Sequence, residues 1–343
     1  MPLTSRALRL ALYCLLILAG AVIAGGWAVR QAEQHALEES ARRGPEQLSL
    51  YANSLHTLIE RYRALPAVLA LDSELVAALS APITPEVQAS LNQKLERING
   101  AAQSSTLELL DRTGLAVAAS NWNTSNSYVG HNYGFRPYFS QTRSQGSGRF
   151  YAVGVTSGIP GYFLSSAVLD AQGQFSGAMV VKLEFPQLER EWNHGNDILL
   201  VSDARGIVFI ANQPGWRYRL LRPLSDSDRS EITLTRQYHN QPLTLLKTHT
   251  LRSFAENSFL TRVDAPTGAA DYLWESLPLT AEGWTLHLLR HPVVAAEDSR
   301  NAALAAIGLW LTLVFSGLFL LQRWRLGRLR QRNREELEQL VEA

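Results

Sequence analysis

Two long uncharged runs stand out in the pattern of apolar and polar positions. The first extends from Leu10 to Val29 and the second from Ala302 to Leu321, and each holds 20 residues without a charge. At a helical rise of about 1.5 Å per residue, each run is long enough to cross a hydrocarbon core of about 30 Å. A cleaved signal peptide is the alternative for the first run. We interpret both runs as transmembrane helices, because the first is long for a signal sequence and a helical pattern follows it after Arg30.

The arginines around these spans predict their orientation. Arg6 and Arg9 precede the first span. Six arginines follow the second span: Arg323, Arg325, Arg328, Arg330, Arg332 and Arg334. Basic residues close to the ends of a span stay in the cytoplasm. Residues 1–9 and 322–343 are therefore predicted to be cytoplasmic, and residues 30–301 to lie on the opposite side of the membrane.

The region between the spans contains an internal repeat. Residues 106–120 read "TLELLDRTGLAVAAS" and residues 198–212 read "ILLVSDARGIVFIAN". Each stretch is an apolar strand, an Asp-x-x-Gly turn and a second apolar strand, with Asp111 and Gly114 matching Asp203 and Gly206 at an offset of 92 residues. Glycine allows the positive φ of a tight hairpin turn. Two such hairpins at this spacing predict a duplicated module with helices and an antiparallel sheet.

The rest of the apolar and polar pattern predicts the other helices and strands of these modules. Residues 31–64 have helical spacing, and we expect a break at Gly44 and Pro45. A second helix is expected from Pro85, with Thr84 as its cap. Three strand-like runs, "RFYAVGV", "YFLSSAVLD" and "FSGAMVVKLEF", predict an antiparallel meander. The expected fold class is α+β, with a distal module at about 66–195 and a proximal module at about 196–290.

Composition excludes several functions. The 32 basic and 31 acidic residues nearly cancel, so no overall positive field favours nucleic acid. Cys14 is the only cysteine, which rules out a disulfide within the chain and a cysteine metal site. The sequence has no nucleophile elbow, glycine-rich phosphate loop or metal-ligand spacing. No catalytic motif therefore lies within these residues, and whether the whole protein is an enzyme stays open.

Three further motifs carry a family resemblance. "NYGFRPYF", "GSGRFYAVGVTSGIPGYFLSSAV" and "GAMVVKLEFPQLEREW" occur in this order, and the likeness is densest over residues 121–213. Together they resemble the periplasmic sensor of the DctB-type C4-dicarboxylate sensor histidine kinases. The resemblance implies a double Cache (PDC, PAS-like) fold that binds its ligand in the membrane-distal module. It also implies a location in the bacterial inner membrane, with two spans and a periplasmic sensor.

A C4-dicarboxylate such as succinate, fumarate or malate has two anionic ends, so its site needs two cationic or donor-rich poles. Arg136 offers a planar fork for one carboxylate. Lys182 offers the other pole, because strand alternation puts it on the same face as Ala178 and Val180. It is one of only three lysines in the chain. The predicted ligand-binding set is Tyr133, Arg136, Thr156, Ser157, Tyr162 and Lys182.

Each candidate has a structural alternative. Arg136 would instead pair with a nearby acid or carbonyl, and Lys182 would extend from a strand edge with its ammonium in water. Thr156 and Ser157 would be ordinary turn residues. Tyr162 would be a core aromatic.

The residues after the second span, 322–343, are predicted to form a cytoplasmic signalling helix. Its polar and apolar spacing favours the start of a coiled coil through Leu326, Leu329, Asn333, Leu337 and Leu340. A basic anchor on anionic lipid is compatible with this seam. The expected partners are a small dicarboxylate, the lipid bilayer and a second copy in a homodimer.

The histidine kinase module of the two-component system is expected outside this chain, with a response regulator downstream of it. No cofactor is expected here, since ATP and Mg²⁺ belong to that module. A chemoreceptor or diguanylate cyclase output, or a membrane protein that binds solute without signalling, is the alternative.

Overall fold

The computed structural model describes residues 5–193, 195–265, 268–292 and 296–342. The chain divides into two compact units, one made of residues 1–43 and 292–343 and the other of residues 44–291. Helix α1 (Ser5–Arg63) contributes to both units. The second unit holds the two large β-sheets, a two-stranded sheet and the candidate site.

The first unit consists of the early part of α1 and helix α8 (Ala296–Glu342). Trp310 Nε1 donates to the carbonyl of Ile17 at 3.0 Å, and its ring lies where a side chain on Gly20 would be. Both helices contain a stretch long and apolar enough to cross a membrane. The predicted coiled-coil seam falls within α8, but the side chains of Asn333, Leu337 and Leu340 lie outside the part that the structure describes.

The distal half of the second unit is a five-stranded antiparallel sheet in the order β2-β1-β5-β4-β3. Its strands are β1 (Thr106–Asp111), β2 (Ala116–Ala119), β3 (Ser147–Val153), β4 (Pro160–Leu169) and β5 (Phe175–Leu183). Its helices are α2 (Leu65–Ala70), α3 (Ser73–Leu79), α4 (Pro85–Ala102), α5 (Pro137–Gln145) and α6 (Pro186–Glu191). Residues of the sheet face that packs with α5 form a separate apolar cluster, which includes Phe163 and Val180. Thr84 caps α4 as predicted.

The proximal half is a six-stranded sheet in the order β10-β11-β12-β13-β6-β7. Its strands are β6 (Ile198–Ser202), β7 (Val208–Ala211), β10 (Thr248–Ala255), β11 (Ser258–Ala265), β12 (Gly268–Leu279) and β13 (Trp284–Arg290). The other elements are the 3-10 helix η1 (Pro214–Trp216), α7 (Asp226–Thr235) and the parallel pair β8 (Arg219–Leu220) and β9 (Thr244–Leu245). The α+β prediction is confirmed.

The two Asp-x-x-Gly hairpins fold in the same way. The Oδ1 atom of Asp111 accepts from the backbone N–H groups two and four residues on, at 2.8 and 3.0 Å. Asp203 repeats both bonds at 3.0 and 2.9 Å. Gly114 and Gly206 adopt φ values of 89° and 79°, which a side chain would strain. The repeat therefore reflects one local turn chemistry used in both sheets.

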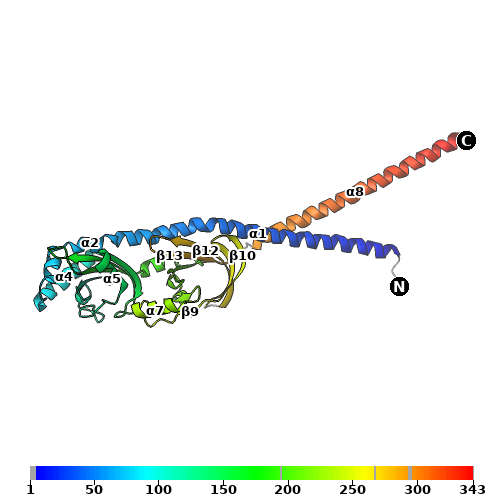
Figure 1. Cartoon of the computed structure of the whole chain (residues 1–343). Helices are drawn as coiled ribbons and strands as arrows, with labels where there is room; N and C mark the ends of the chain where they lie inside the picture. The colour runs from blue at the N-terminus through cyan, green and yellow to red at the C-terminus, as the bar shows by residue number, and fades with distance from the viewer. Residues whose placement is uncertain (1–4, 194, 266–267, 293–295, 343) are drawn as a thin grey trace. The chain divides into compact units, whose positions relative to one another are not determined.

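The expected break at Gly44 and Pro45 is wrong, because α1 continues through both residues. The backbone of Gly44 lies so close to the Glu275 carboxylate that an added Cβ would be 1.8 Å from it. Leu48 then enters the main core at 1% exposure, in one cluster with residues of both sheets such as Leu107 and Leu286. Tertiary packing thus outweighs the helix-breaking tendency of proline. Figure 1 shows α1 from residue 44 onward running along both sheets.

Candidate functional site

A buried lysine marks the face of the five-stranded sheet that packs with α5. Lys182 follows Ala178 and Val180 on this face of β5, and only 1% of its surface is exposed. Its Nζ atom donates to Glu184 Oε1 at 2.6 Å and to Ser157 Oγ at 3.4 Å. An ammonium is rarely buried unless it is paired. The predicted orientation of Lys182 toward the interior is therefore what the structure has.

Aromatic rings and glycines surround this lysine. Nζ lies 6.0 Å from the ring centre of Tyr128 and 5.9 Å from that of Phe163, within the range of cation–π attraction. A Cβ on Gly161 would come within 2.6 Å of Lys182 Cε, and one on Gly154 within 3.8 Å of Nζ. The bare backbone at Gly161 leaves the space that the lysine stem needs.

Two loops close over the cavity beside Lys182. Tyr133 and Thr156 share a hydrogen bond of 2.8 Å between their hydroxyls, and Tyr128 donates to Ser157 at 3.3 Å. The cavity behind them has a volume of about 10 Å³, enough for about one water. A larger molecule enters only if the loop before α5 and the 154–159 turn separate.

Arg136 lies in the wall of this cavity at 1% exposure, but its fork is occupied. Nη1 donates to the carbonyls of Thr235 and Arg236 at 3.0 and 3.1 Å, and Nη2 to that of Val153 at 2.7 Å. The first two carbonyls end α7, where a cation is favourable. Phe135 packs against the guanidinium at 5.2 Å. The guanidinium is thus bonded to backbone carbonyls, as in the alternative given for Arg136, and its role in ligand binding stays a prediction. Arg136 supplies positive charge to the cavity wall while it holds the end of α7.

Sequence reasoning missed Glu108, which also lines the cavity. It is 2% exposed, accepts from the Tyr138 hydroxyl at 3.4 Å, and its Oε2 atom has no hydrogen-bond partner in the described part of the chain. Burial raises the pKa of Glu108 to about 7, against smaller lowering effects of Tyr138, Lys182 and Arg136. A charged residue inside the apolar strand "TLELLD" was the available signal.

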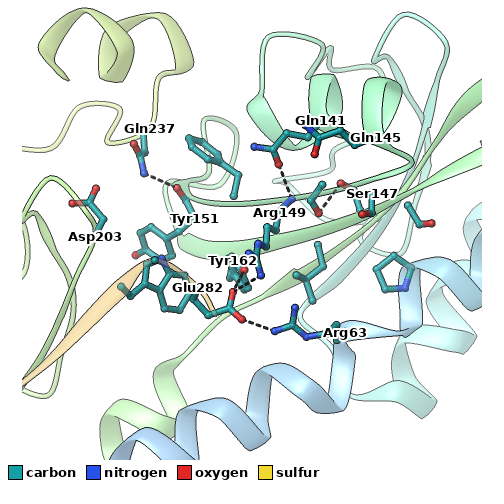
Figure 2. A pocket seen from close by; sticks show the side chains of 18 of the residues that line it. Arg63, Gln141, Gln145, Ser147, Arg149, Tyr151, Tyr162, Asp203, Gln237 and Glu282 are labelled. Carbon is teal, nitrogen blue, oxygen red and sulfur yellow. Dashed lines mark hydrogen bonds and ion pairs between the residues drawn. The ribbon is translucent and has the colours of Figure 1, made fainter. Parts of the chain in front are cut away.

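Tyr162 does not line this cavity, so the structure does not bring it together with the other predicted ligand-binding residues. It lies on the opposite face of β4 from Phe163, and its hydroxyl donates to Glu282. Figure 2 shows this second site, a polar cleft of about 730 Å³ in which Arg63 and Arg149 also converge on the Glu282 carboxylate. Both arginines of this cluster are paired with Glu282. The smaller cavity is the better candidate for the predicted site, because its wall brings together Tyr133, Arg136 and Thr156, and Lys182 and Ser157 lie next to it.

Comparisons with known proteins identify the relatives of this chain. No family model matches it. It is 32% identical over 298 residues to the C4-dicarboxylate transport sensor protein DctB of Rhizobium meliloti strain 1021, covering 86% of this chain and 48% of that protein. It is 30% identical over 292 residues to the protein of the same name from Pseudomonas aeruginosa PAO1, covering 82% of this chain and 44% of that protein. The chain thus spans about half the length of these curated relatives.

Solved structures agree with the sequence relatives. The sensor domain of the V. cholerae histidine kinase DctB matches with a TM-score of 0.67 and 27% identity, covering 75% of this chain and 98% of the sensor domain. The periplasmic domain of RsbU from Chlamydia trachomatis matches with a TM-score of 0.55 and 15% identity, over 75% of this chain and 94% of that domain, and indicates the fold alone. The resemblance to the DctB-type sensors and the DctB sensor-domain fold are confirmed.

Proposed function

We propose that this chain is the sensing and membrane-anchoring part of a C4-dicarboxylate receptor of a two-component system. Two relatives named as C4-dicarboxylate transport sensors support the ligand class. Residues 30–301 face the periplasm in this proposal, and the spans at 10–29 and 302–321 hold the receptor in the inner membrane as a homodimer. A histidine kinase module outside this chain then acts on a response regulator.

The observation that carries the proposal is the buried ammonium of Lys182. Its neighbours Ser157, Tyr128 and Phe163 form a water-poor wall with one hydroxyl at 3.4 Å. In such surroundings a carboxylate that replaces or joins Glu184 on Lys182 forms a strong charge-assisted bond. The aromatic rings suit the short carbon chain between the two ligand carboxylates.

The second ligand carboxylate would lie toward Arg136, Tyr133 and Thr156. Binding separates the Tyr133–Thr156 and Tyr128–Ser157 pairs, because the cavity has room for about one water. Each freed hydroxyl can then donate to a carboxylate oxygen. The hydrogen bonds that close the cavity are thus exchanged for bonds to the ligand.

The test is calorimetry on the full chain in detergent, with succinate, fumarate, malate and the monoacid butyrate. We expect the diacids to bind and butyrate not to bind. Lys182→Met should weaken diacid binding by about one to two decades, which corresponds to the loss of about 1.5–3 kcal/mol for a charged pole.

Lys247→Met is the matched control, because Lys247 is exposed in the other sheet region and should leave binding unchanged. Thermal unfolding of both variants checks that they fold. Absence of heat with all three diacids, or equal binding by the Lys182 variant, contradicts the proposal.

A further inference from the structure

Glu108 poses an electrostatic problem for a cavity that takes an anion. It lies on strand β1, and its partner in the register is Val180, two residues from Lys182 on the central strand β5. The ammonium of Lys182 bonds to Glu184 and Ser157 instead. One oxygen of Glu108 therefore lies in the cavity wall without a partner among the described residues. An ionised carboxylate in this position would repel any incoming carboxylate.

The charges around Glu108 can be counted element by element. Strand β5 contributes Lys182, whose charge is matched by Glu184 just beyond the strand. The segment leading into α5 contributes Arg136. Among the described residues, the other titratable groups that line the cavity with Glu108 are the phenols Tyr128, Tyr133 and Tyr138, and Lys182 lies next to this lining. Strands β2 and β4 contribute no charge, since Ala119 and Phe163 face this region. The charges of Glu108, Lys182, Glu184 and Arg136 sum to zero with Glu108 ionised and to +1 with Glu108 protonated. Arg236, just after α7, adds positive charge near Arg136 in both states.

We propose that Glu108 takes up one proton from solvent when a diacid dianion binds, so that the site senses the diacid and the proton together. This inference rests on the proposed function. The protonated carboxyl has an O–H that can donate to a ligand carboxylate, whereas the ionised form only accepts. The unpartnered oxygen is the atom placed to carry that proton.

The proposal fixes the form of the pH dependence. Burial raises the pKa of Glu108 to about 7 in the cavity as it stands. A bound dianion raises it further, because a nearby like charge disfavours ionisation. Affinity is then constant at pH values where Glu108 is already protonated. Above about pH 7 it falls by up to tenfold per pH unit, which is the slope for one linked proton.

Proton uptake can be measured directly on the wild-type full chain in detergent. The probe is fumarate, whose carboxyls are both ionised above about pH 6. Calorimetry at pH 6 and pH 8, each in two buffers of different ionisation enthalpy, gives the number of protons taken up. We expect close to one proton at pH 8, almost none at pH 6, and affinity at pH 8 up to tenfold weaker than at pH 7.

Glu108→Gln keeps the shape and supplies a permanent donor. This variant should bind fumarate at pH 8 as tightly as the wild type does at pH 6, with no proton uptake at either pH. Glu275→Gln is the matched control, because Glu275 is also buried, and its Oε1 atom has no hydrogen-bond partner within the described ranges, but it lies in the other sheet. It should retain the wild-type pH dependence.

Thermal unfolding confirms that the Glu108 variant folds. An unfolded glutamate has a pKa of about 4.3, below that of Glu108 in the fold, so the wild type loses stability as pH rises between these values. Glu108→Gln should not show that loss.

The results separate the two proposals. Wild-type binding of fumarate without proton uptake at pH 8 overturns the role of Glu108 and leaves the dicarboxylate site intact. A second pair of results also overturns the role of Glu108: the folded Glu108→Gln variant fails to bind fumarate, and the wild type binds aspartate. Glu108 would then pair with the ammonium of the ligand. If the wild type binds no diacid at any pH, the proposed function itself fails.

Discussion

Replacing Glu282 with glutamine should weaken the junction between the two sheets. Glu282 precedes β13 of the proximal sheet, yet its carboxylate accepts bonds from Arg63 at the end of α1 and from Arg149 and Tyr162 of the distal sheet. Only 5% of the Glu282 side chain is exposed. Glutamine keeps its size but removes the charge that the two arginines share.

The expected loss follows from the exposure of the partners. Buried charge-assisted hydrogen bonds contribute about 1.5–3 kcal/mol each, whereas exposed ion pairs contribute about 0.2–1 kcal/mol. Arg63 and Arg149 are 36% and 48% exposed, so both pairs are weakened by solvent screening. We therefore expect Glu282→Gln to lower the free energy of unfolding by about 1–3 kcal/mol. For a unit of this size, at about 2–4 °C per kcal/mol, that lowers Tm by about 2–12 °C.

Thermal unfolding of the full chain in detergent, at low and high salt, measures the effect. Salt should reduce the difference between wild type and variant, because it screens the part of the interaction that solvent reaches. Glu231→Gln is the control, since Glu231 pairs with Arg205 at 2.6 Å but is 58% exposed, and it should change Tm by less than about 2 °C. Tyr162→Phe removes one donor to Glu282 and should leave diacid binding unchanged. A Glu282→Gln protein that unfolds at the wild-type temperature refutes the reasoning.

Two further predictions concern the cavity wall and the topology. Arg136→Ala should lower the free energy of unfolding by about 2–4 kcal/mol, because the carbonyls of Val153, Thr235 and Arg236 lose their donor. Arg136→Lys should recover only part of this lost stability. An Arg136→Ala protein as stable as the wild type contradicts this assignment. A reporter enzyme that works only after export should be active when it is inserted near Gln241, and a reporter that works only in the cytoplasm should be inactive there. Activity of the cytoplasmic reporter would overturn the proposed orientation.

The parts of the fold that depend on local sequence were predictable. The two hairpins follow from Asp111, Asp203 and the glycines after them, because all the bonds that define each turn lie within five residues. The inward orientation of Lys182 follows from the alternation in β5. The continuation of α1 through Pro45 was not predictable, because it depends on packing against Glu275 and against core residues far along the chain.

The differences between the predicted and observed surroundings of the site residues have equally specific causes. Strand β4 is apolar on both faces, so a period of two cannot tell whether Tyr162 or Phe163 faces the cavity. The partners of Arg136 on α7 lie about 100 residues along the chain, and no local pattern indicates them. Glu108 did leave a signal, as an acidic residue within an apolar strand. Its pairing with Val180, which only the structure shows, places it on the same sheet face as the cavity.

Arg136 connects the cavity to the proximal half through the carbonyls at the end of α7. In the proposed site, a diacid drawn toward this positive charge would compete with those carbonyls for the guanidinium, and loss of these bonds would release the end of α7. A ligand shifts such an equilibrium only by the difference between its affinities for the two arrangements. Because a protonated Glu108 leaves the charge of Arg136 uncompensated in the cavity, the proton increases this difference as well as the affinity. In this proposal Glu108 therefore sets two properties: the pH dependence of diacid binding, and how far binding shifts the equilibrium at the end of α7.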